Sequence, residues 1–247
     1  MADDSFGVLL ERLALGKMGE LVAAAHQAGT RSELEAVLRG GSPGSDLLRV
    51  LAPVLGWHAA DVFALADVSL PDDLRPADRS TGGGVPALVR SFIALGLEQQ
   101  AEVLHFVASM PAERPAAPVR TPPHMVYPSG PGGILMRLAR NRGLGWSATA
   151  QTLAVTTGRY WSAATYGGMG HGRVSLSSEL LGDFSALLDI SEEDLTAVTG
   201  TAFPVFTAER KADLQRVGDL IWQVRCLSAS QLGQARARAD AMAVKER

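Results

Sequence analysis

The stretch GLGWSATAQTLAVTTGRYWSAATY, residues 143–166, places a glycine between two short segments with a helical pattern of apolar residues. Apolar residues recur there at three- and four-residue spacing, which favours helices over strands. Small residues at Ala150 and Ala154 and an apolar anchor at Tyr160 suit two short helices that pack closely. We therefore expect a helix-turn-helix, with helices near residues 147–154 and 157–166.

Helical patterns continue on both sides of this stretch. We expect further helices near Gly133–Arg142, Ser177–Leu188 and Glu192–Thr199. Ser147 is a candidate N-cap for the first helix of the pair, and Ser191 precedes three acids that a helix N-terminus favours. The glycine-rich residues 167–173 are expected to form a loop whose backbone amides can approach a phosphate.

The first half of the chain resembles the second. Arg12-Leu13-Ala14 recurs as Arg137-Leu138-Ala139, and the pattern of residues 46–62 recurs at 179–195. The alternative is chance similarity between apolar helices. Seven prolines between Pro111 and Pro131 exclude a helix and indicate a connector. The expected organisation is a helical domain at 1–110, a Pro-rich linker at 111–132 and a second helical domain with an extension at 133–247, all-α throughout.

Charge is unevenly distributed along the chain. The net charge is -3, yet residues 114–178 contain no Asp or Glu while they contain seven arginines. Such a segment is suited to the phosphates of nucleic acid. For Arg137, Arg140 and Arg142 the alternative is that they only stabilise the C-terminal end of a helix dipole.

The residues quoted above resemble one known family. Gly143-Leu144-Gly145-Trp146-Ser147, Ala150, residues 153–156, 177–181 and 188–195 look like the XRE or phage-repressor family of helix-turn-helix regulators, and residues 220–225 look like its helical extension. The resemblance spans about residues 133–242 and, more faintly, 6–110. It implies tandem lambda-repressor-like bundles of about five helices, recognition of double-stranded DNA by the third helix, and a homodimer on a two-fold operator.

On this basis the expected function is that of a DNA-binding transcriptional regulator. The residues expected to contact DNA are Arg137, Arg140, Arg142, Ser147, Thr157, Gly158, Arg159, Trp161, Ser162, His171 and Arg173. The sequence departs from the family where Trp146 and Ser147 replace a common Gln. Gly158, Trp161 and Ala164 also make base-specific recognition less assured than contact with DNA.

The N-terminal copy is less suited to DNA. Glu20, Glu33 and Glu35 fall where the phosphate backbone would lie and would repel it. We expect this copy to serve in packing, in dimerisation or in binding a partner protein. Two other functions remain open for the whole chain: a protein-interaction adaptor and a sequence-tolerant, nucleoid-associated DNA-binding protein.

The sequence contains no motif that indicates another class of function. The sequence has no phosphate-binding loop, no metalloprotease or hydrolase motif and a single cysteine, Cys226, so we expect no enzyme activity, metal or organic cofactor. No leader and no run of 18 apolar residues is present, so we expect no membrane contact and a cytoplasmic, nucleoid-associated protein.

Overall fold

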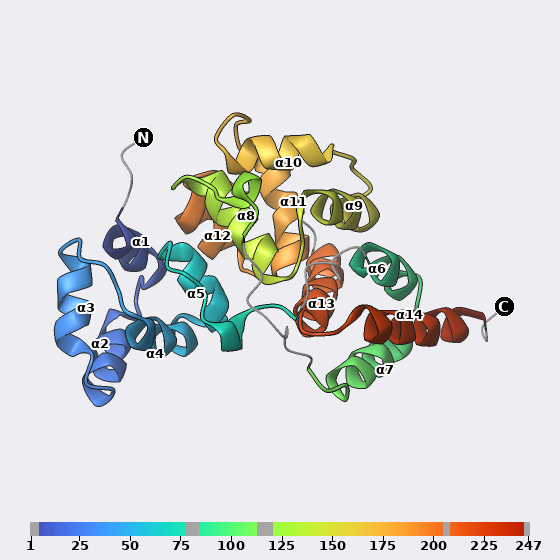
Figure 1. The fold of residues 1–247 in the computed structure, drawn as a ribbon, viewed down its shortest axis with the longest axis horizontal. Coiled ribbons are helices and arrows are strands. Elements are labelled where there is room, and N and C mark those ends of the chain that lie inside the picture. Colours follow the sequence, from blue (N-terminus) through green and yellow to red (C-terminus); the bar gives the residue numbers. More distant parts are fainter. Residues whose placement is uncertain (1–4, 78–83, 113–120, 205–207, 245–247) are drawn as a thin grey trace.

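The computed structural model describes residues 5–77, 84–112, 121–204 and 208–244, and in these residues the protein is built from α-helices without a strand (Figure 1). The prediction of an all-α protein is therefore confirmed. Among the described residues no single helix is both long and apolar enough to cross a membrane; α4 and α5 meet that test only as a pair bent by 114°.

Five helices and then a further pair follow one another in each half of the chain, and only in the second half are both helices of that pair longer than the five before them. The first half contains α1 (Phe6–Leu13), α2 (Met18–Gln27), α3 (Arg31–Leu38), α4 (Ser45–Leu55), α5 (Ala59–Leu65), α6 (Val85–Ile93) and α7 (Leu97–Ala108). The second contains α8 (Pro131–Asn141), α9 (Trp146–Thr157), α10 (Ala163–Gly170), α11 (Ser178–Leu188), α12 (Glu192–Thr199), α13 (Ala208–Val224) and α14 (Ala229–Val244). We call α1–α5 the N-terminal unit and α8–α12 the C-terminal unit.

Local signals explain where several of these helices begin and end. The Ser191 hydroxyl accepts a hydrogen bond from the Asp194 amide at 3.0 Å, so the predicted cap of α12 is confirmed. Ser147, by contrast, lies inside α9, whose N-cap is Gly145, so that predicted cap is wrong. Gly56 and Asp189 take the left-handed conformation directly after the equivalent helices α4 and α11.

The connector between the halves runs from the end of α7 at Ala108 to the start of α8 at Pro131, so it is displaced by two residues from the predicted linker. Residues 113–120 of the predicted linker lie outside the described residues. Beyond them a single 3-10 turn at Pro123–Met125 leads to α8, and Pro131 is the first residue of that helix rather than part of the linker. Tyr127 is buried, so the last part of the connector packs on the C-terminal unit.

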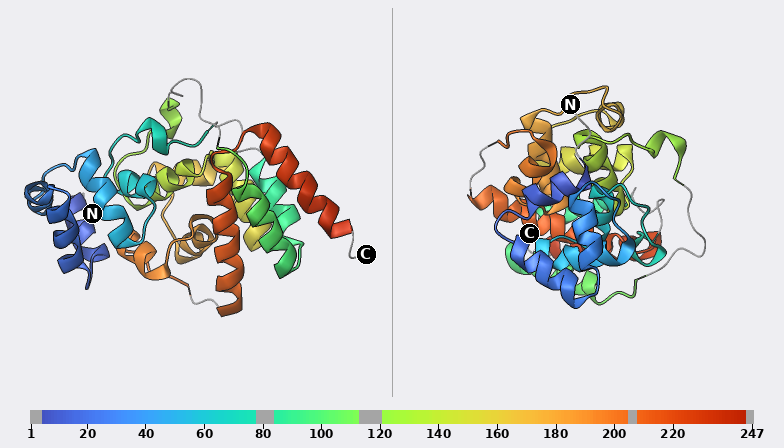
Figure 2. Two further views of the ribbon diagram at one scale, coloured as in Figure 1. Left: turned by 90° about the horizontal axis from the view of Figure 1, so that it is seen from below. Right: turned by 90° about the vertical axis from the view of Figure 1, so that its left-hand side faces the viewer.

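The two halves share one apolar core. It runs from Leu9 in α1 to Met242 in α14, because helices of the first half pack directly on helices of the second. α6 contacts α9, α13 and α14, while α5 contacts α8 and α1 contacts α12. Figures 1 and 2 show α2 and α3 at one end of the molecule, α7 and α14 near the other, and the C-terminal unit between them.

Candidate nucleic-acid interface

The helix pair α9–α10 is joined by a longer turn than the sequence suggested. α9 continues to Thr157 and closes at Gly158, where φ is 73°. The chain then stays non-helical until Ser162, whose hydroxyl accepts a hydrogen bond from the Thr165 amide at 3.2 Å and caps α10. The turn therefore spans Gly158–Ser162, whereas a helix-turn-helix commonly has three or four turn residues.

This shift changes the role of the residues predicted on the recognition helix. Thr157 ends α9, and Gly158, Arg159 and Trp161 lie in the turn, so the predicted helix over residues 157–166 is wrong before residue 163 and overlaps α10 only at 163–166. Tyr160, the predicted anchor, is 75% exposed. The anchoring aromatic residue is Tyr166, which is fully buried and meets the ring of Phe184 edge to face.

The predicted phosphate-binding loop is instead the C-terminal half of α10. Gly167, Gly168 and Gly170 are helical and buried. A Cβ atom at Gly167 would lie 2.7 Å from the Trp146 ring, and one at Gly170 would lie 2.7 Å from the Tyr127 ring. These glycines let α10 approach aromatic rings, so their amides are part of a packed helix and not of an open loop.

His171 closes α10 and also faces the protein. Its Nε2 atom lies 3.0 Å from the His124 carbonyl oxygen, and its ring lies close to those of Tyr127 and Trp146. Beyond it, Gly172 and Arg173 are exposed. Of the predicted glycine-rich phosphate site, only these two residues are placed where a ligand could reach them.

Two of the predicted phosphate-binding arginines bind the first half of the chain. The Nε atom of Arg137 donates to the Ala64 carbonyl at 3.0 Å, and its Nη1 atom lies 3.4 Å from Asp67. Burial lowers the pKa of Arg137, and the charge of Asp67 opposes this. Residues 114–178 contain no carboxylate, but carboxylates from other parts of the chain contact their arginines in the folded protein.

Arg142 is fully buried. It donates to both oxygens of the buried Asp61, with Nη1–Oδ1 at 3.1 Å and Nη2–Oδ2 at 3.0 Å, and also to the carbonyls of Leu138 and Leu188. The ring of Trp222 lies 5.1 Å from its guanidinium carbon. The prediction that Arg142 contacts DNA is wrong for this structure, because the side chain is a bridge between the halves.

Arg140 holds the segment that precedes α8. Its Nη2 atom donates to the Thr121 hydroxyl at 2.7 Å, and its Nη1 atom donates to the Met125 carbonyl at 3.4 Å. The side chain is half-buried, so less of its guanidinium group can reach DNA than the sequence suggested.

A buried carboxylate that the sequence analysis missed organises the turn. Asp183 of α11 accepts hydrogen bonds from Arg159, whose Nε lies 3.1 Å from Oδ1. Burial raises the pKa of Asp183, and the hydrogen bond from Arg159 together with its positive charge opposes that rise. Arg159 keeps 39% of its side chain exposed, so it is partly neutralised but still within reach of a ligand.

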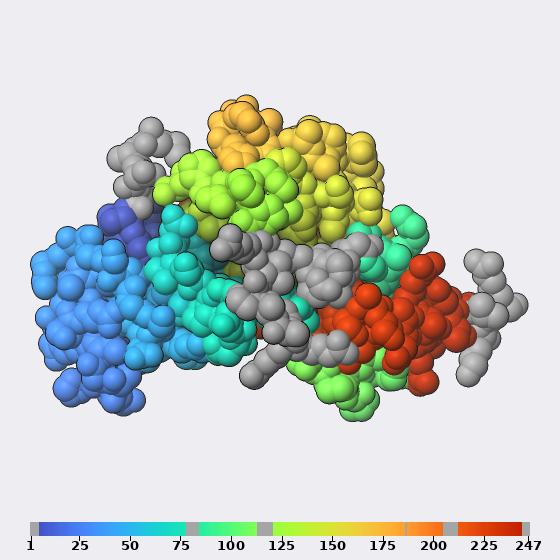
Figure 3. All heavy atoms as spheres, viewed as in Figure 1, coloured from blue at the N-terminus to red at the C-terminus, as the bar shows by residue number. Residues whose placement is uncertain are grey.

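The surface that remains around α9 and α10 has a consistent character. No Asp or Glu occurs in α6, α8, α9 or α10, and the structure describes every residue of these four helices. In Figure 3 residues of about 131–175 form one continuous face along the upper edge of the molecule. The exposed residues of α6, α9, α10 and the adjoining turns include Arg90, Ser147, Gln151, Gly158, Tyr160, Ser162, Ala164, Gly172 and Arg173.

The N-terminal unit presents the tighter helix-turn-helix geometry of the two. Only Ala28, Gly29 and Thr30 separate α2 from α3, and Gly29 has a φ of 73°. Glu33 accepts a hydrogen bond from the Gly44 amide. Its negative charge is therefore directed at the N-terminus of α4 rather than outward.

Glu35 in the same unit is paired with Arg31 at 3.1 Å, on an exposed face. Glu20 remains exposed. The predicted repulsion of DNA by this unit thus depends mainly on Glu20, because the charges of the other two glutamates have partners within the protein.

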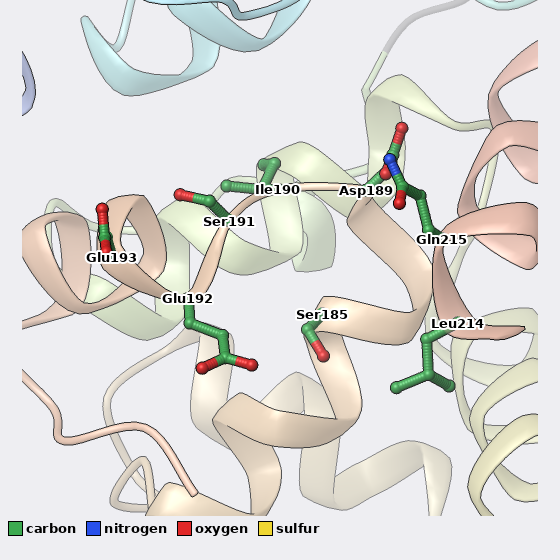
Figure 4. Close-up of a pocket in the computed structure, with 8 residues that line it drawn as sticks. All are labelled: Ser185, Asp189, Ile190, Ser191, Glu192, Glu193, Leu214 and Gln215. Atoms are coloured by element: carbon green, nitrogen blue, oxygen red, sulfur yellow. The ribbon is translucent and has the colours of Figure 1, made fainter. Parts of the chain in front are cut away.

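One pocket is formed elsewhere, between the end of α11, the start of α12 and α13. Its volume is about 490 Å³, and in Figure 4 the side chains of Glu192 and Ser185 point toward it. None of the predicted DNA contacts lines it. Within the described parts of the chain, no group of three or more His, Cys, Asp or Glu side chains could hold a metal ion.

Comparison with known proteins finds no counterpart: no family model matches the chain, and no curated protein or solved structure is similar enough to count as a match. The resemblance to repressor-like regulators therefore stays an interpretation of the motifs quoted above.

Proposed function

We propose that the protein is a DNA-binding regulator that contacts duplex DNA through α10, the α9–α10 turn and the neighbouring end of α9. The observation that carries the proposal is that α6, α8, α9 and α10 contain no carboxylate of their own; those that contact them, among them Asp67, Asp183 and Asp240, come from neighbouring elements. Duplex DNA repels carboxylates and accepts hydrogen bonds from arginine, hydroxyl groups and helix N-termini. The exposed N-terminus of α10, with Ser162 as its cap, supplies the last of these.

The set of contacts in this proposal is smaller than the sequence suggested. Arg90, Arg159 and Arg173 are the cations exposed on or beside this face, while Arg137 and Arg142 bind Asp67 and Asp61. Binding that neutralises roughly three phosphates has a slope of about -3 in a plot of log affinity against log salt. The proposed complex is therefore less dependent on salt than one formed by all seven arginines of the window.

The test is a fluorescence-polarisation titration of the full chain with a mixed-sequence duplex at several salt concentrations. We expect Arg90→Ala and Arg173→Ala each to reduce the magnitude of the slope by about 0.9. Arg49→Ala is the control, because Arg49 is in the N-terminal unit and pairs with Asp73 at 2.8 Å. Absence of binding at low salt contradicts the proposal, and so does an equal effect of the control.

A second candidate is a protein-interaction adaptor, which the exposure of Tyr160 favours. An aromatic side chain that is 75% exposed on a surface turn is typical of an interface anchor. In an adaptor, Tyr160→Ala abolishes capture of the partner while Arg90→Ala and Arg173→Ala have no effect. In a DNA-binding regulator the two arginine variants have the larger effect, and mapping of genomic occupancy separates a few sharp sites from broad, architectural coverage.

A further inference from the structure

The two halves contact one another reciprocally: the first helix of each unit packs on the fifth helix of the other. α1, the first helix of the N-terminal unit, packs on α12, the fifth helix of the C-terminal unit. In return α8, the first helix of the C-terminal unit, packs on α5, the fifth helix of the N-terminal unit. This reciprocity is the property of an isologous interface, in which the same patch serves on both partners.

Side chains at equivalent positions of α5 and α12 also bind the opposite half. Asp61 is the third residue of α5 and Asp194 is the third residue of α12. Asp61 accepts hydrogen bonds from Arg142 and Asn141 of α8 and its C-cap, and Asp194 accepts one from the Trp57 indole of the first half at 3.1 Å. The same position therefore holds an acceptor for the opposite half in each case.

The helix pairs α6–α7 and α13–α14 show the same reciprocal packing. α6 packs on α14, and α13 packs on α7, so the first helix of each pair contacts the second helix of the other pair (Figure 1). The starts of α7 and α14 are also built alike. Gln99 accepts a hydrogen bond from the Gly96 amide at 3.2 Å, and Gln231 accepts one from the Ser228 amide at 2.9 Å.

We propose that the halves of this chain pair as the protomers of a two-fold dimer would, so that each pairing surface has the other half of the same chain as its partner. The protein then acts as a monomer that contains its own dimer, in place of the homodimer expected from the sequence. The proposal goes beyond the proposed function and holds whether or not the protein binds DNA.

Covalent linkage explains how such an interface can be maintained with polar groups inside it. A short linker gives the halves an effective concentration on the order of millimolar, so association does not depend on the protein concentration. Under that condition the interface can include the fully buried Arg142–Asp61 pair, whose burial is costly unless both charges are satisfied.

The experiment cuts the folded full chain. A protease site is inserted between Ala112 and Thr121, the purified protein is cleaved, and the mass is measured by sedimentation velocity at several concentrations. We expect both the uncut and the cut protein to sediment as one species of 26.0 kDa. Separation of the cut halves at micromolar concentration, or a dimer of the uncut chain, overturns the proposal.

Three variants then test the reciprocal contacts in the cut protein. Arg142→Ala is expected to raise the dissociation constant of the halves by at least about 100-fold, since it leaves Asp61 buried without its cation. Trp57→Phe keeps the apolar ring and removes the donor to Asp194, so we expect a rise of roughly 3- to 10-fold. Arg49→Ala removes an ion pair within the first half of the chain and should leave the constant unchanged.

Trp57→Phe is informative even if Arg142→Ala fails to fold, because it keeps an aromatic ring in the core and leaves no charge unpaired. An effect of Trp57→Phe no larger than that of Arg49→Ala overturns the reciprocal arrangement.

Discussion

Asp183 determines how much of the charge of Arg159 is available to a ligand. Its carboxylate is fully buried under the α9–α10 turn and pairs with a guanidinium that is partly exposed. A phosphate that approaches the turn therefore competes with Asp183 for Arg159. Because burial raises the pKa of Asp183, a moderately acidic solution protonates the carboxyl more readily than usual and weakens this competition.

Asp183→Asn is the corresponding prediction. The neutral amide releases Arg159, so the proposed DNA complex should tighten severalfold at low salt, while its salt slope should stay near about -3 because Arg159 is already one of the three cations counted. Polarisation titrations at several salt concentrations measure both quantities. In the double variant with Arg159→Ala the gain should vanish, and a gain that persists there would show that Asp183 acts through another group.

His58 gives a prediction on pH. Its ring stacks on Trp222 with centroids 3.6 Å apart, at a junction that also contains Asp61, Arg142, Arg225 and Asp219. Burial lowers the pKa of His58; the carboxylates oppose that shift and the two arginines add to it. The native state therefore keeps the ring neutral at a pH where the unfolded chain takes up a proton.

The free energy of unfolding should consequently fall as the pH decreases through about 6.5, the usual pKa of histidine, and this contribution should be complete above that pH. His58→Phe retains the stacked ring and should flatten the dependence between about pH 5 and pH 7.5. Urea unfolding across this range measures the slope. An unchanged slope in the variant would assign the pH dependence to other groups.

The arginines show how far residue-level prediction could go. The absence of acids over residues 114–178 was visible in the sequence, and it correctly describes the helices α8–α10. The partners of Arg137 and Arg142 could not be found that way, because Asp67 and Asp61 come from the other half. A signal did exist: Asp61 and Asp194 are matched by the repeat, and Asp61 lies in the otherwise apolar helix α5, where a carboxylate needs a partner.

At the scale of elements, α10 is the helix whose position the prediction got wrong, and α12 is the one that it placed correctly. α12 spans the predicted residues Glu192–Thr199, because a serine cap, acids in the first turn and a closing glycine all agree. α10 contains three glycines, which have low helix propensity and favoured a loop. Packing against Trp146 and Tyr127 outweighs that propensity, and no local pattern in the sequence reveals such contacts.

This explanation of α10 predicts opposite signs for one substitution at two helical glycines. Gly167→Ala places a Cβ against the Trp146 ring, which a 2.7 Å hydrogen bond to the Tyr127 hydroxyl holds in place, and should destabilise the protein by about 1–3 kcal/mol. Gly233→Ala, in the open face of α14, should stabilise it by about 0.5–1 kcal/mol. Chemical denaturation measures both; stabilisation by Gly167→Ala would contradict the close approach.

At the scale of the whole molecule, the reciprocal contacts join equivalent helices, but the helices packed around them differ between the two halves. α6 of the first half covers α9, whereas α13 of the second half packs on α11, so the exchange of helices is incomplete. The sequence repeat predicted two bundles separated by a linker. It could not predict that the bundles face each other, since that depends on apolar faces whose partners lie far away in the chain.

The difference in environment gives a prediction for the two matched aspartates. Asp61→Asn leaves the fully buried Arg142 without a countercharge and should lower the free energy of unfolding by about 3–5 kcal/mol. Asp194→Asn retains an oxygen that can accept from the Trp57 indole, so its cost should stay below about 1 kcal/mol. Urea unfolding of the two variants compares the costs directly. Equal costs would mean that the buried ion pair adds nothing beyond a hydrogen bond, and the larger cost at Asp61 would locate the strongest link between the halves at α5 and α8.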